Sequence, residues 1–227
     1  MENLNIALIG CGMIGREHIE RIQNRIRNAR IVAVCDVFEE GAKKGAEIAG
    51  AGTKVYTDFN EAINDPDVNA VVVTTPGQFH KGPVLAAIKA GKPVFSEKPL
   101  ANTAADGKEI VEAEMAGGKH LVQVGFMRRY DPGYGQLKKA IDSGKYGLPL
   151  MLHCVHRNYD APGFTTSMPV ENSMIHEIDV LRWLLGENYK TAEVVFPKTT
   201  RNAEGELRDP QIMYYYRYSK NRYPAHK

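Results

Sequence analysis

The stretch "NIALIGCGMIGREHIERIQNRIR", residues 5–27, decides the fold of the amino-terminal half of the chain. It begins as an apolar run suited to a buried strand, passes through three glycines and continues as a helical pattern. Gly10, Gly12 and Gly15 have G-x-G-x-x-G spacing. The first allows a tight turn, the second lets the backbone approach a phosphate group, and the third lets helix and strand pack closely. A strand, a glycine turn and a helix in this order predict the start of a βαβ unit.

Further apolar runs follow at intervals and alternate with helical segments. They are "RIVAVCD", "KVYTD", "NAVVVTT", "KPVFSE" and "LVQVGF". Because these runs are rich in Val and Ile with little polar alternation, they suit parallel strands covered by helices on both faces. We therefore predict an α/β fold in which residues 1–126 form a doubly wound parallel sheet of the Rossmann type.

The composition restricts the class of protein. The 227 residues include 29 Lys and Arg against 27 Asp and Glu, a formal charge of +2, so nucleic-acid binding is not expected. No apolar stretch approaches the roughly 20 residues that span a bilayer, and the amino terminus begins as a strand, so we expect a cytoplasmic protein without membrane contact. Cys11, Cys35 and Cys154 are widely spaced, which argues against disulfides and a structural zinc, and we expect no metal site.

The glycine turn predicts a dinucleotide cofactor. Free N–H groups at a helix N-terminus bind phosphate, so its pyrophosphate is expected against Gly10, Gly12, Met13, Ile14 and Gly15. Asp36 ends the second strand, where a carboxylate accepts hydrogen bonds from the ribose hydroxyls and repels a 2′-phosphate, which favours NAD over NADP. The alternative for Asp36 is a loop carboxylate that caps a turn.

The ends of the next strands carry further candidates, because ligands of open α/β sheets bind outside the carboxyl ends of the strands. The loop "TTPGQFH" is expected beside the nicotinamide half of the cofactor. Its cofactor-side residues are Thr74, Thr75, Pro76 and His80. His80 contacts the cofactor or caps the next helix. In "SEKPL", Glu97 and Lys98 lie at the same edge; we interpret Glu97 as structural, and Lys98 faces the cofactor unless it is a surface lysine paired with Glu97.

Residues 171–186, "ENSMIHEIDVLRWLLG", predict an amphipathic helix that carries a lone histidine. One stripe is expected in the core and holds Met174, Ile178, Leu181 and Leu185. A second stripe carries polar groups and holds Asn172, His176, Asp179 and Trp183. Taken alone, His176 is interpreted as a partly buried histidine hydrogen-bonded to Asp179, three residues further on.

These motifs together resemble the Gfo/Idh/MocA oxidoreductases, and within that family the inositol dehydrogenases. Besides the glycine turn they are "TTPGQFH", "AAIKAGKPVFSEKP", "GFMRRYDPGY" and "HEIDVLRW", and the resemblance runs from residue 4 to about residue 212. It implies NAD-dependent oxidation of a cyclic polyol alcohol to a ketone, first of all myo-inositol to scyllo-inosose. It also implies a homotetramer and a second, α+β domain over residues 127–227, incomplete here, with an open antiparallel sheet.

The resemblance also implies roles for particular residues. Lys98 binds the substrate hydroxyl and helps to manage its proton, and Pro99 follows a cis peptide bond; an ammonium there stabilises developing alkoxide charge. His176 is the base, since a histidine pKa lies near the working pH. The polyol-contacting residues are Met127, Arg128 and His156. Arg128 could instead pair with Asp131. His156 lies in "LMLHCVHRNYDAPG", which predicts a strand of the second sheet.

Asn172 departs from the family pattern, which has a catalytic aspartate four residues before the histidine. An amide still hydrogen-bonds a hydroxyl but carries no charge to stabilise a protonated ring. Two alternatives therefore remain: another sugar or polyol oxidoreductase of the same superfamily, or a catalytically impaired, truncated dinucleotide-binding protein. The tail "MYYYRYSKNRYPAHK", residues 213–227, lacks clear strand alternation, and we expect a frameshift or premature end there.

Overall fold

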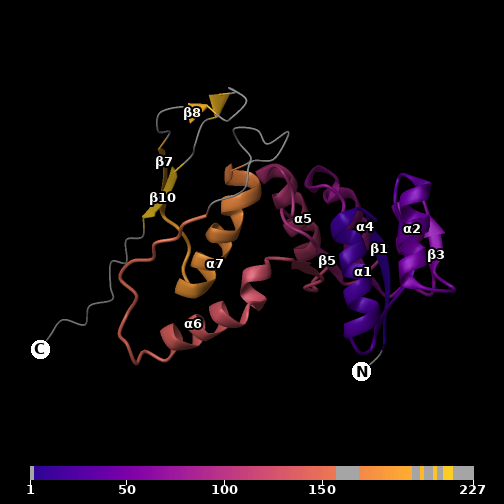
Figure 1. Ribbon diagram of the computed structural model, residues 1–227, viewed down its shortest axis with the longest axis horizontal. Helices are drawn as coiled ribbons and strands as arrows, with labels where there is room; N and C mark the ends of the chain where they lie inside the picture. The colour runs from indigo at the N-terminus through magenta and orange to yellow at the C-terminus, as the bar shows by residue number, and fades with distance from the viewer. Residues whose placement is uncertain (1–2, 157–168, 196–199, 202–206, 209–211, 217–227) are drawn as a thin grey trace, which may run out of the picture. The chain divides into compact units, whose positions relative to one another are not determined.

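The computed structural model describes residues 3–156, 169–195, 200–201, 207–208 and 212–216. The chain divides into two compact units, Met1–Gly125 and Phe126–Lys227, which are described separately. Among the described residues, no helix combines the length and apolar character needed to cross a membrane. Figure 1 shows the elements of both units.

The first unit is a six-stranded parallel sheet in the order β3-β2-β1-β4-β5-β6. The strands are β1 Leu4–Ile9, β2 Ala29–Cys35, β3 Lys54–Tyr56, β4 Ala70–Val73, β5 Val94–Ser96 and β6 Val122–Val124. The helices are α1 Met13–Arg25, α2 Glu39–Ala49, α3 Phe59–Asn64, the 3-10 turn η1 Gly77–Phe79, α4 Lys81–Lys89 and α5 Ala104–Ala116. This strand order reverses direction between β1 and β4, as in doubly wound dinucleotide-binding domains. The predicted fold class is confirmed.

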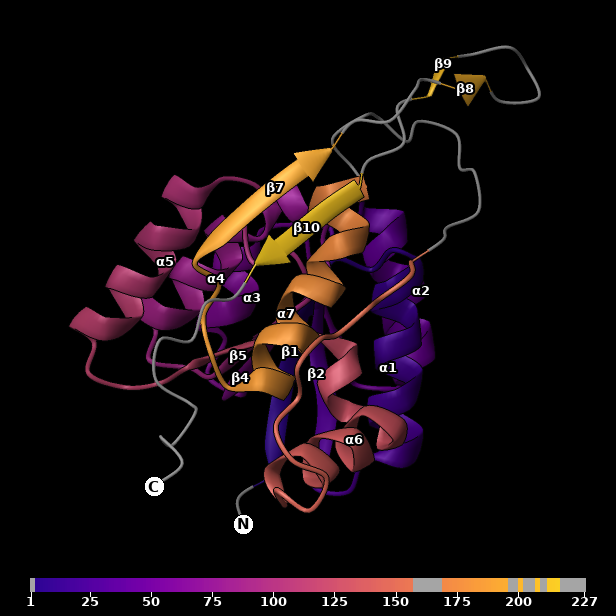
Figure 2. The same cartoon turned by 90° about the vertical axis from the view of Figure 1, so that its left-hand side faces the viewer.

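Side chains of β1 alternate between two hydrophobic cores. Ala7 and Ile9 pack with buried residues of α3, α4 and α5. Ile6 and Leu8 face the opposite way and pack with α1 and α2. Figure 2 shows these two groups of helices on opposite sides of the sheet. Successive residues of a strand point to opposite faces, so a strand that is apolar throughout must be covered by helices on both faces of the sheet. The strand β1 is covered in this way.

Cys11 and Cys35 are free thiols beside the glycine turn, and Cys154 is free as well. Burial, followed by the nearby Asp36 carboxylate, raises the pKa of both Cys11 and Cys35 to about 12. Neutral thiols are poor nucleophiles, so these two side chains serve as small apolar core residues.

The second unit contains helices and short antiparallel strand pairs. The helical segments are η2 Met127–Tyr130, α6 Pro132–Asp142, the π-helix η3 Pro169–Met174 and α7 Ile175–Leu185. The strands are β7 Thr191–Val195, β8 Thr200–Arg201, β9 Leu207–Arg208 and β10 Ile212–Tyr216. The strand β10 pairs antiparallel with β7, and β8 pairs antiparallel with β9. Gly186 ends α7 in the left-handed conformation, at φ 66°.

Two sequence predictions in this unit are wrong. Of the strand predicted over residues 150–163, residues 150–156 are not a strand: Leu150, Met151 and Val155 are exposed, and no described strand pairs with this segment, while residues 157–163 lie outside the described residues. An apolar run becomes a strand only where a neighbouring edge accepts its backbone hydrogen bonds. Conversely, Ile212–Tyr216, where we expected no strand, forms β10 because β7 supplies such an edge. The rest of the tail, residues 217–227, lies outside the described residues.

The predicted core stripe of the His176 helix is also wrong. The buried residues of this segment are Ser173, His176, Glu177, Asp179, Val180 and Leu184. The side chains expected in the core, at positions 174, 178, 181 and 185, are only partly buried. The buried face is therefore rotated toward polar residues. Paired polar groups can be buried at little cost, and hydrophobic periodicity does not detect their partners.

Candidate active site

The three glycines of the first turn differ in what surrounds them. Gly10 has φ +101°, and a Cβ there would lie 2.6 Å from the backbone nitrogen of Thr75. A Cβ on Gly15 would overlap the carbonyl oxygen of Gly10. A Cβ on Gly12, by contrast, would meet nothing within 4 Å, and no side chain caps the start of α1 at that residue. Gly10 and Gly15 are therefore required by packing, whereas Gly12 leaves the helix N-terminus open to an anionic ligand.

Asp36 is tied to the same turn. Its Oδ2 accepts a hydrogen bond from the Cys11 backbone nitrogen at 2.8 Å, and its Oδ1 accepts one from the Phe38 backbone nitrogen at 3.0 Å. These contacts agree with the alternative in which Asp36 caps a turn. A carboxylate has about four acceptor positions, however, so Asp36 can still accept hydrogen bonds from ribose hydroxyls. Val37 and Phe38 follow it with exposed side chains, Phe38 at 75%. These two residues were missed by sequence reasoning, although exposed apolar residues beside a carboxylate that is predicted to bind ribose suit an adenine face.

Thr74 and Thr75 follow β4 at the same edge of the sheet. The Thr74 hydroxyl is buried and donates to the carbonyl oxygen of Gly10 at 2.7 Å, which fixes the glycine turn against β4. Among the described residues, the buried hydroxyl of Thr75 has no hydrogen-bond partner. A polar ligand at this edge of the sheet would supply the missing hydrogen-bond partner of this buried hydroxyl. The local geometry therefore fits a bound dinucleotide.

His80 lies beneath this loop, and neither of its expected roles describes its contacts. The side chain is 1% exposed, which leaves it almost no surface for a cofactor, and it makes no capping hydrogen bond to α4. Its Nε2 is 2.7 Å from the carbonyl oxygen of Thr75, and its Nδ1 is 2.6 Å from the carbonyl oxygen of Pro99. The ring therefore bridges two backbone segments. Direct contact between His80 and a cofactor is not supported because the imidazole is enclosed.

Glu97 and Lys98 follow β5, and the Lys98–Pro99 peptide bond is cis, as the resemblance implies. Glu97 accepts hydrogen bonds from His18 Nε2 at 2.9 Å and from the backbone nitrogen of Lys98 at 3.2 Å. Burial by itself would raise the pKa of Glu97, but the His18 hydrogen bond and the neighbouring positive charges lower it below its usual value. These contacts favour the structural interpretation of Glu97. The Lys98 side chain is partly buried at this edge.

In the second unit, Glu177 joins two residues that were expected at the substrate. Its Oε1 forms an ion pair with Arg128 Nη1, and its Oε2 lies 2.8 Å from His156 Nδ1. Because Glu177 is 5% exposed, both contacts are shielded from water. His156 Nδ1 also lies 3.5 Å from Arg128 Nη2, but the shorter contact to the carboxylate fixes Nδ1 as a donor. Sequence reasoning missed Glu177, which carries no motif signal beyond its place after His176.

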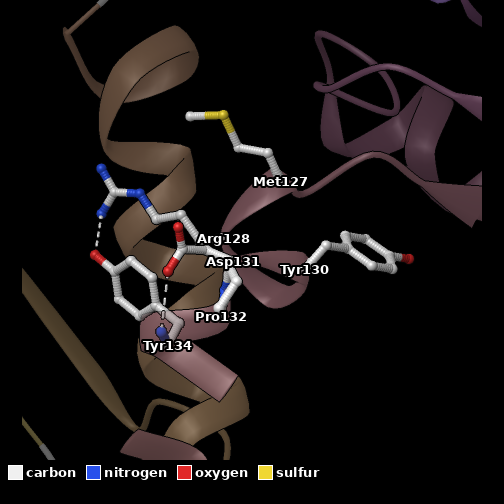
Figure 3. A pocket seen from close by; sticks show the side chains of 6 residues that line it. All are labelled: Met127, Arg128, Tyr130, Asp131, Pro132 and Tyr134. Carbon is white, nitrogen blue, oxygen red and sulfur yellow. Dashed lines mark hydrogen bonds between the residues drawn. The ribbon is translucent and has the colours of Figure 1, made fainter. Parts of the chain in front are cut away.

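Arg128 also borders an open hollow of about 540 Å³ in the second unit, shown in Figure 3. The hollow is lined by Met127, Arg128, Tyr130, Asp131, Pro132 and Tyr134. Arg128 Nη1 donates to the Tyr134 hydroxyl at 3.2 Å. Asp131 instead caps α6, accepting from the Gly133 and Tyr134 backbone nitrogens at 2.8 and 3.1 Å. The alternative pairing of Arg128 with Asp131 is therefore wrong, because the Asp131 carboxylate caps the N-terminus of α6 and Arg128 pairs with Glu177.

His176 is 7% exposed and lies in the first turn of α7. Asp179, the predicted partner of His176, forms a two-pronged ion pair with Arg129 at 2.6 and 2.7 Å. The same hydrogen bonds raise the pKa of Arg129. Asn172 is partly buried and lies in η3, whose π-helical turn is wider than an α-helical turn. Single π turns within helices are frequent at functional sites.

Metal-ligating side chains do not gather in the part of the chain that the structure describes. Within residues 3–156, 169–195, 200–201, 207–208 and 212–216, no group of three or more His, Cys, Asp or Glu is placed to hold a metal ion. The candidate residues are backbone N–H groups, hydroxyls and a lysine in the first unit, and an arginine and histidines in the second unit.

Comparison with known proteins covers both units. Residues 4–126 match the model "Oxidoreductase family, NAD-binding Rossmann fold", and residues 134–216 match the GFO/IDH/MocA C-terminal domain, which extends the similarity beyond the expected residue 212. The chain is 53% identical over 211 residues to the inositol 2-dehydrogenase of Burkholderia cenocepacia, covering 92% of this chain and 63% of that protein. It is 48% identical over 212 residues to the inositol 2-dehydrogenase of Klebsiella pneumoniae, covering 93% and 63%.

A solved structure is similar as well. The myo-inositol dehydrogenase of Lactobacillus casei, in complex with NAD(H) and myo-inositol, superposes with a TM-score of 0.83 at 36% sequence identity. The similarity covers 93% of this chain and 63% of that one. The chain thus spans about five-eighths of the length of these relatives.

Proposed function

Because the chain belongs to the Gfo/Idh/MocA oxidoreductase family, we propose that it acts as an NAD-dependent dehydrogenase that oxidises a ring alcohol of a cyclic polyol to a ketone. The first substrate to consider is myo-inositol, with scyllo-inosose as the product. The observation that carries this proposal is the 53% identity over 211 residues to an inositol 2-dehydrogenase, which extends through both units. The first unit is the family's NAD-binding domain.

The residues around the glycine turn suit NAD. The open N-terminus of α1 would hold the pyrophosphate against the backbone of Gly12, Met13 and Ile14. Asp36 would accept the ribose hydroxyls, and its negative charge would repel the 2′-phosphate of NADP. Thr75 and Pro76 would lie toward the nicotinamide half. NAD supplies the hydride acceptor of the reaction when it is bound.

The chain's own residues must then handle a proton and the charge that develops on the substrate oxygen. We assign the base to His176, since neutral imidazole accepts a proton near physiological pH. Lys98 would hold a substrate hydroxyl and stabilise negative charge on its oxygen as the C–H bond is lost. Asn172 would contact the substrate through its amide. These roles follow the family pattern at the matching positions.

Arg128, His156 and Met127 would bind the remaining hydroxyls and one face of the polyol ring. Arg128 donates hydrogen bonds only, so it suits hydroxyl oxygens. Glu177 would act as a positioning residue, because it holds both Arg128 and His156 through shielded contacts. Fixing two polar side chains before the substrate arrives reduces the ordering cost of binding.

A second candidate function is supported by Asn172. The amide cannot stabilise a protonated His176 as a carboxylate would, and a different polyol or sugar could be preferred for that reason. A third possibility is a dinucleotide-binding protein without turnover. The family relation also supports a cytoplasmic homotetramer, which light scattering after gel filtration would measure.

Activity measurements separate these candidates. NADH formation would be followed at 340 nm with myo-inositol, its isomers and hexoses, for the wild type and for Lys98→Ala, His176→Ala and Asn172→Asp. We expect activity with myo-inositol and a loss of at least about a hundredfold in the two alanine variants. His120→Gln, at a fully exposed side chain, is the control. Activity only with another polyol would favour the second candidate, and tight NADH binding without any turnover would favour the third.

A further inference from the structure

His80 has an unusual set of hydrogen-bond partners. Both of its ring nitrogens lie against backbone carbonyl oxygens, at 2.6 Å from Pro99 and 2.7 Å from Thr75. Carbonyl oxygens only accept hydrogen bonds, so each ring nitrogen must donate one. A neutral imidazole carries a single N–H and would turn a nitrogen lone pair toward the lone pairs of the second oxygen.

We propose that His80 is a buried, doubly protonated imidazolium that fastens the loop after β4 to the loop after β5. The 2.6 Å contact is short for a neutral N–H···O hydrogen bond, the 2.7 Å contact lies at the lower end of the usual range, and both agree with the shorter lengths of charge-assisted bonds. The charge and contacts of His80 are independent of the proposed enzymatic function, whereas its positioning role rests on the cofactor site proposed above.

Several features oppose a positive charge at this position. Burial disfavours the charged form, and His80 immediately precedes α4, whose N-terminus carries a partial positive charge. The charged groups on the neighbouring elements are Lys81 of α4, Asp106 and Glu109 of α5, and Glu97 and Lys98 after β5. Lys81 is paired with Asp106 and Glu109, each at 2.6 Å, which neutralises it. Burial and the partial charge of the helix N-terminus still oppose the positive charge. The two carbonyl dipoles turn their negative ends toward the ring and favour it, and each carbonyl oxygen receives a hydrogen bond only if the nitrogen that it faces keeps its proton.

The bridge would position the predicted cofactor edge. Thr75, whose carbonyl His80 binds, has its backbone nitrogen packed against Gly10 of the glycine turn. Pro99, whose carbonyl is the second partner, directly follows Lys98. One ring thus connects the segment that supports the glycine turn with the segment that carries Lys98. His80 is a positioning residue in this arrangement and touches neither substrate nor cofactor.

The charge can be observed directly by NMR. The full chain would be labelled with ¹⁵N-histidine and measured at about pH 8, above the pKa of about 6.5 of an unperturbed histidine. His80→Gln assigns the His80 signals by their disappearance, and the fully exposed His120 serves as the comparison within the same molecule. We expect two protonated nitrogens on the His80 ring, with both N–H protons protected from exchange with water. A ring with one N–H and one unprotonated nitrogen would overturn the proposal.

The positioning role has a separate readout. A glutamine at position 80 carries both of its side-chain N–H groups on one nitrogen, whereas His80 reaches the two carbonyl groups from two separate ring nitrogens, so glutamine does not reproduce the bridge. We expect His80→Gln to weaken NADH binding, measured by fluorescence titration, by about tenfold, whereas His120→Gln leaves it unchanged. If His80→Gln does not fold, the His80 signals are assigned through the backbone by triple-resonance experiments, and the NMR result on the wild type still decides the charge. Unchanged NADH binding in a folded His80→Gln variant would overturn the positioning role, whether or not any polyol is oxidised.

Discussion

Asp65 combines burial with several hydrogen bonds at the edge of the first sheet. Its side chain is 2% exposed and accepts from Lys54 Nζ at 2.8 Å, from the Tyr56 hydroxyl at 2.5 Å and from the Asp67 backbone nitrogen at 2.8 Å. Burial alone would raise the pKa of Asp65, but these donors together lower it to about 2. The carboxylate is therefore stabilised in its ionised form in the folded state.

That lowered pKa links stability to pH. The ionised form of Asp65 stabilises the fold fully above about pH 4, and the contribution is lost as the pH falls from about 4 to about 2. We expect Asp65→Asn to lower the free energy of unfolding by roughly 2 kcal/mol at neutral pH, with a difference from wild type that shrinks below about pH 4. Urea unfolding of both proteins across this pH range measures the difference in the free energy of unfolding. Asp142→Asn, in an exposed pair with Lys138, should cost less than about 0.5 kcal/mol. A difference independent of pH would contradict the linkage.

Glu177 gives a second prediction for a single residue. Replacing it with glutamine removes the charge that holds Arg128 and His156 but keeps the size of the side chain. We expect Glu177→Gln to raise the KM for the polyol about tenfold while the KM for NAD stays nearly constant, because only the polyol-binding side chains lose their support. Steady-state kinetics measure both constants. Arg182→Gln, exposed on the same helix, is the control. Equal changes in the KM for the polyol and the KM for NAD would show that the substitution affects the whole fold instead.

The glycine turn allows stability and cofactor binding to be separated within one element. Gly12→Ala adds a methyl group that meets nothing in the chain, so thermal unfolding without cofactor should stay unchanged. Its NADH affinity should fall at least about tenfold, since the methyl group would lie where we propose that the pyrophosphate binds. Gly10→Ala should lower the free energy of unfolding by about 2 kcal/mol or more, because its φ is +101° and its Cβ would meet Thr75. Equal NADH affinity in Gly12→Ala and wild type would place the cofactor elsewhere.

Elements with local signals were predictable from the sequence. The strands and glycine turn of the first unit have runs of Val and Ile and fixed glycine spacing, and these reflect interactions within one βαβ unit. The buried face of α7 was not predictable, because it depends on Arg128 and Arg129, which are distant in sequence, pairing with Glu177 and Asp179. The strand Ile212–Tyr216 likewise depends on β7. His80 carried a motif signal, but its contacts with two carbonyl groups could only come from the structure.

At the scale of the whole molecule, the two units differ in how much apolar surface they bury among the described residues. Both large clusters of buried apolar side chains belong to the first unit. In the second unit, Val180 and Leu184 are buried, whereas Leu148, Leu150 and Met151 are exposed. Since burial of apolar surface is the main favourable term in folding, the first unit has the larger internal source of stability.

This difference predicts that residues 1–125 fold alone. All residues that we assign to the NAD site from Gly10 to Lys98 lie in this unit, as do both hydrophobic clusters. We expect the fragment to unfold cooperatively in urea and to bind NADH with a Kd within a factor of about three of that of the whole chain. It should form no NADH with myo-inositol, because His176 is absent. The fragment with Gly12→Ala should unfold identically but bind NADH more weakly. If the fragment folds yet fails to bind NADH that the whole chain binds, residues 126–227 must complete the cofactor site.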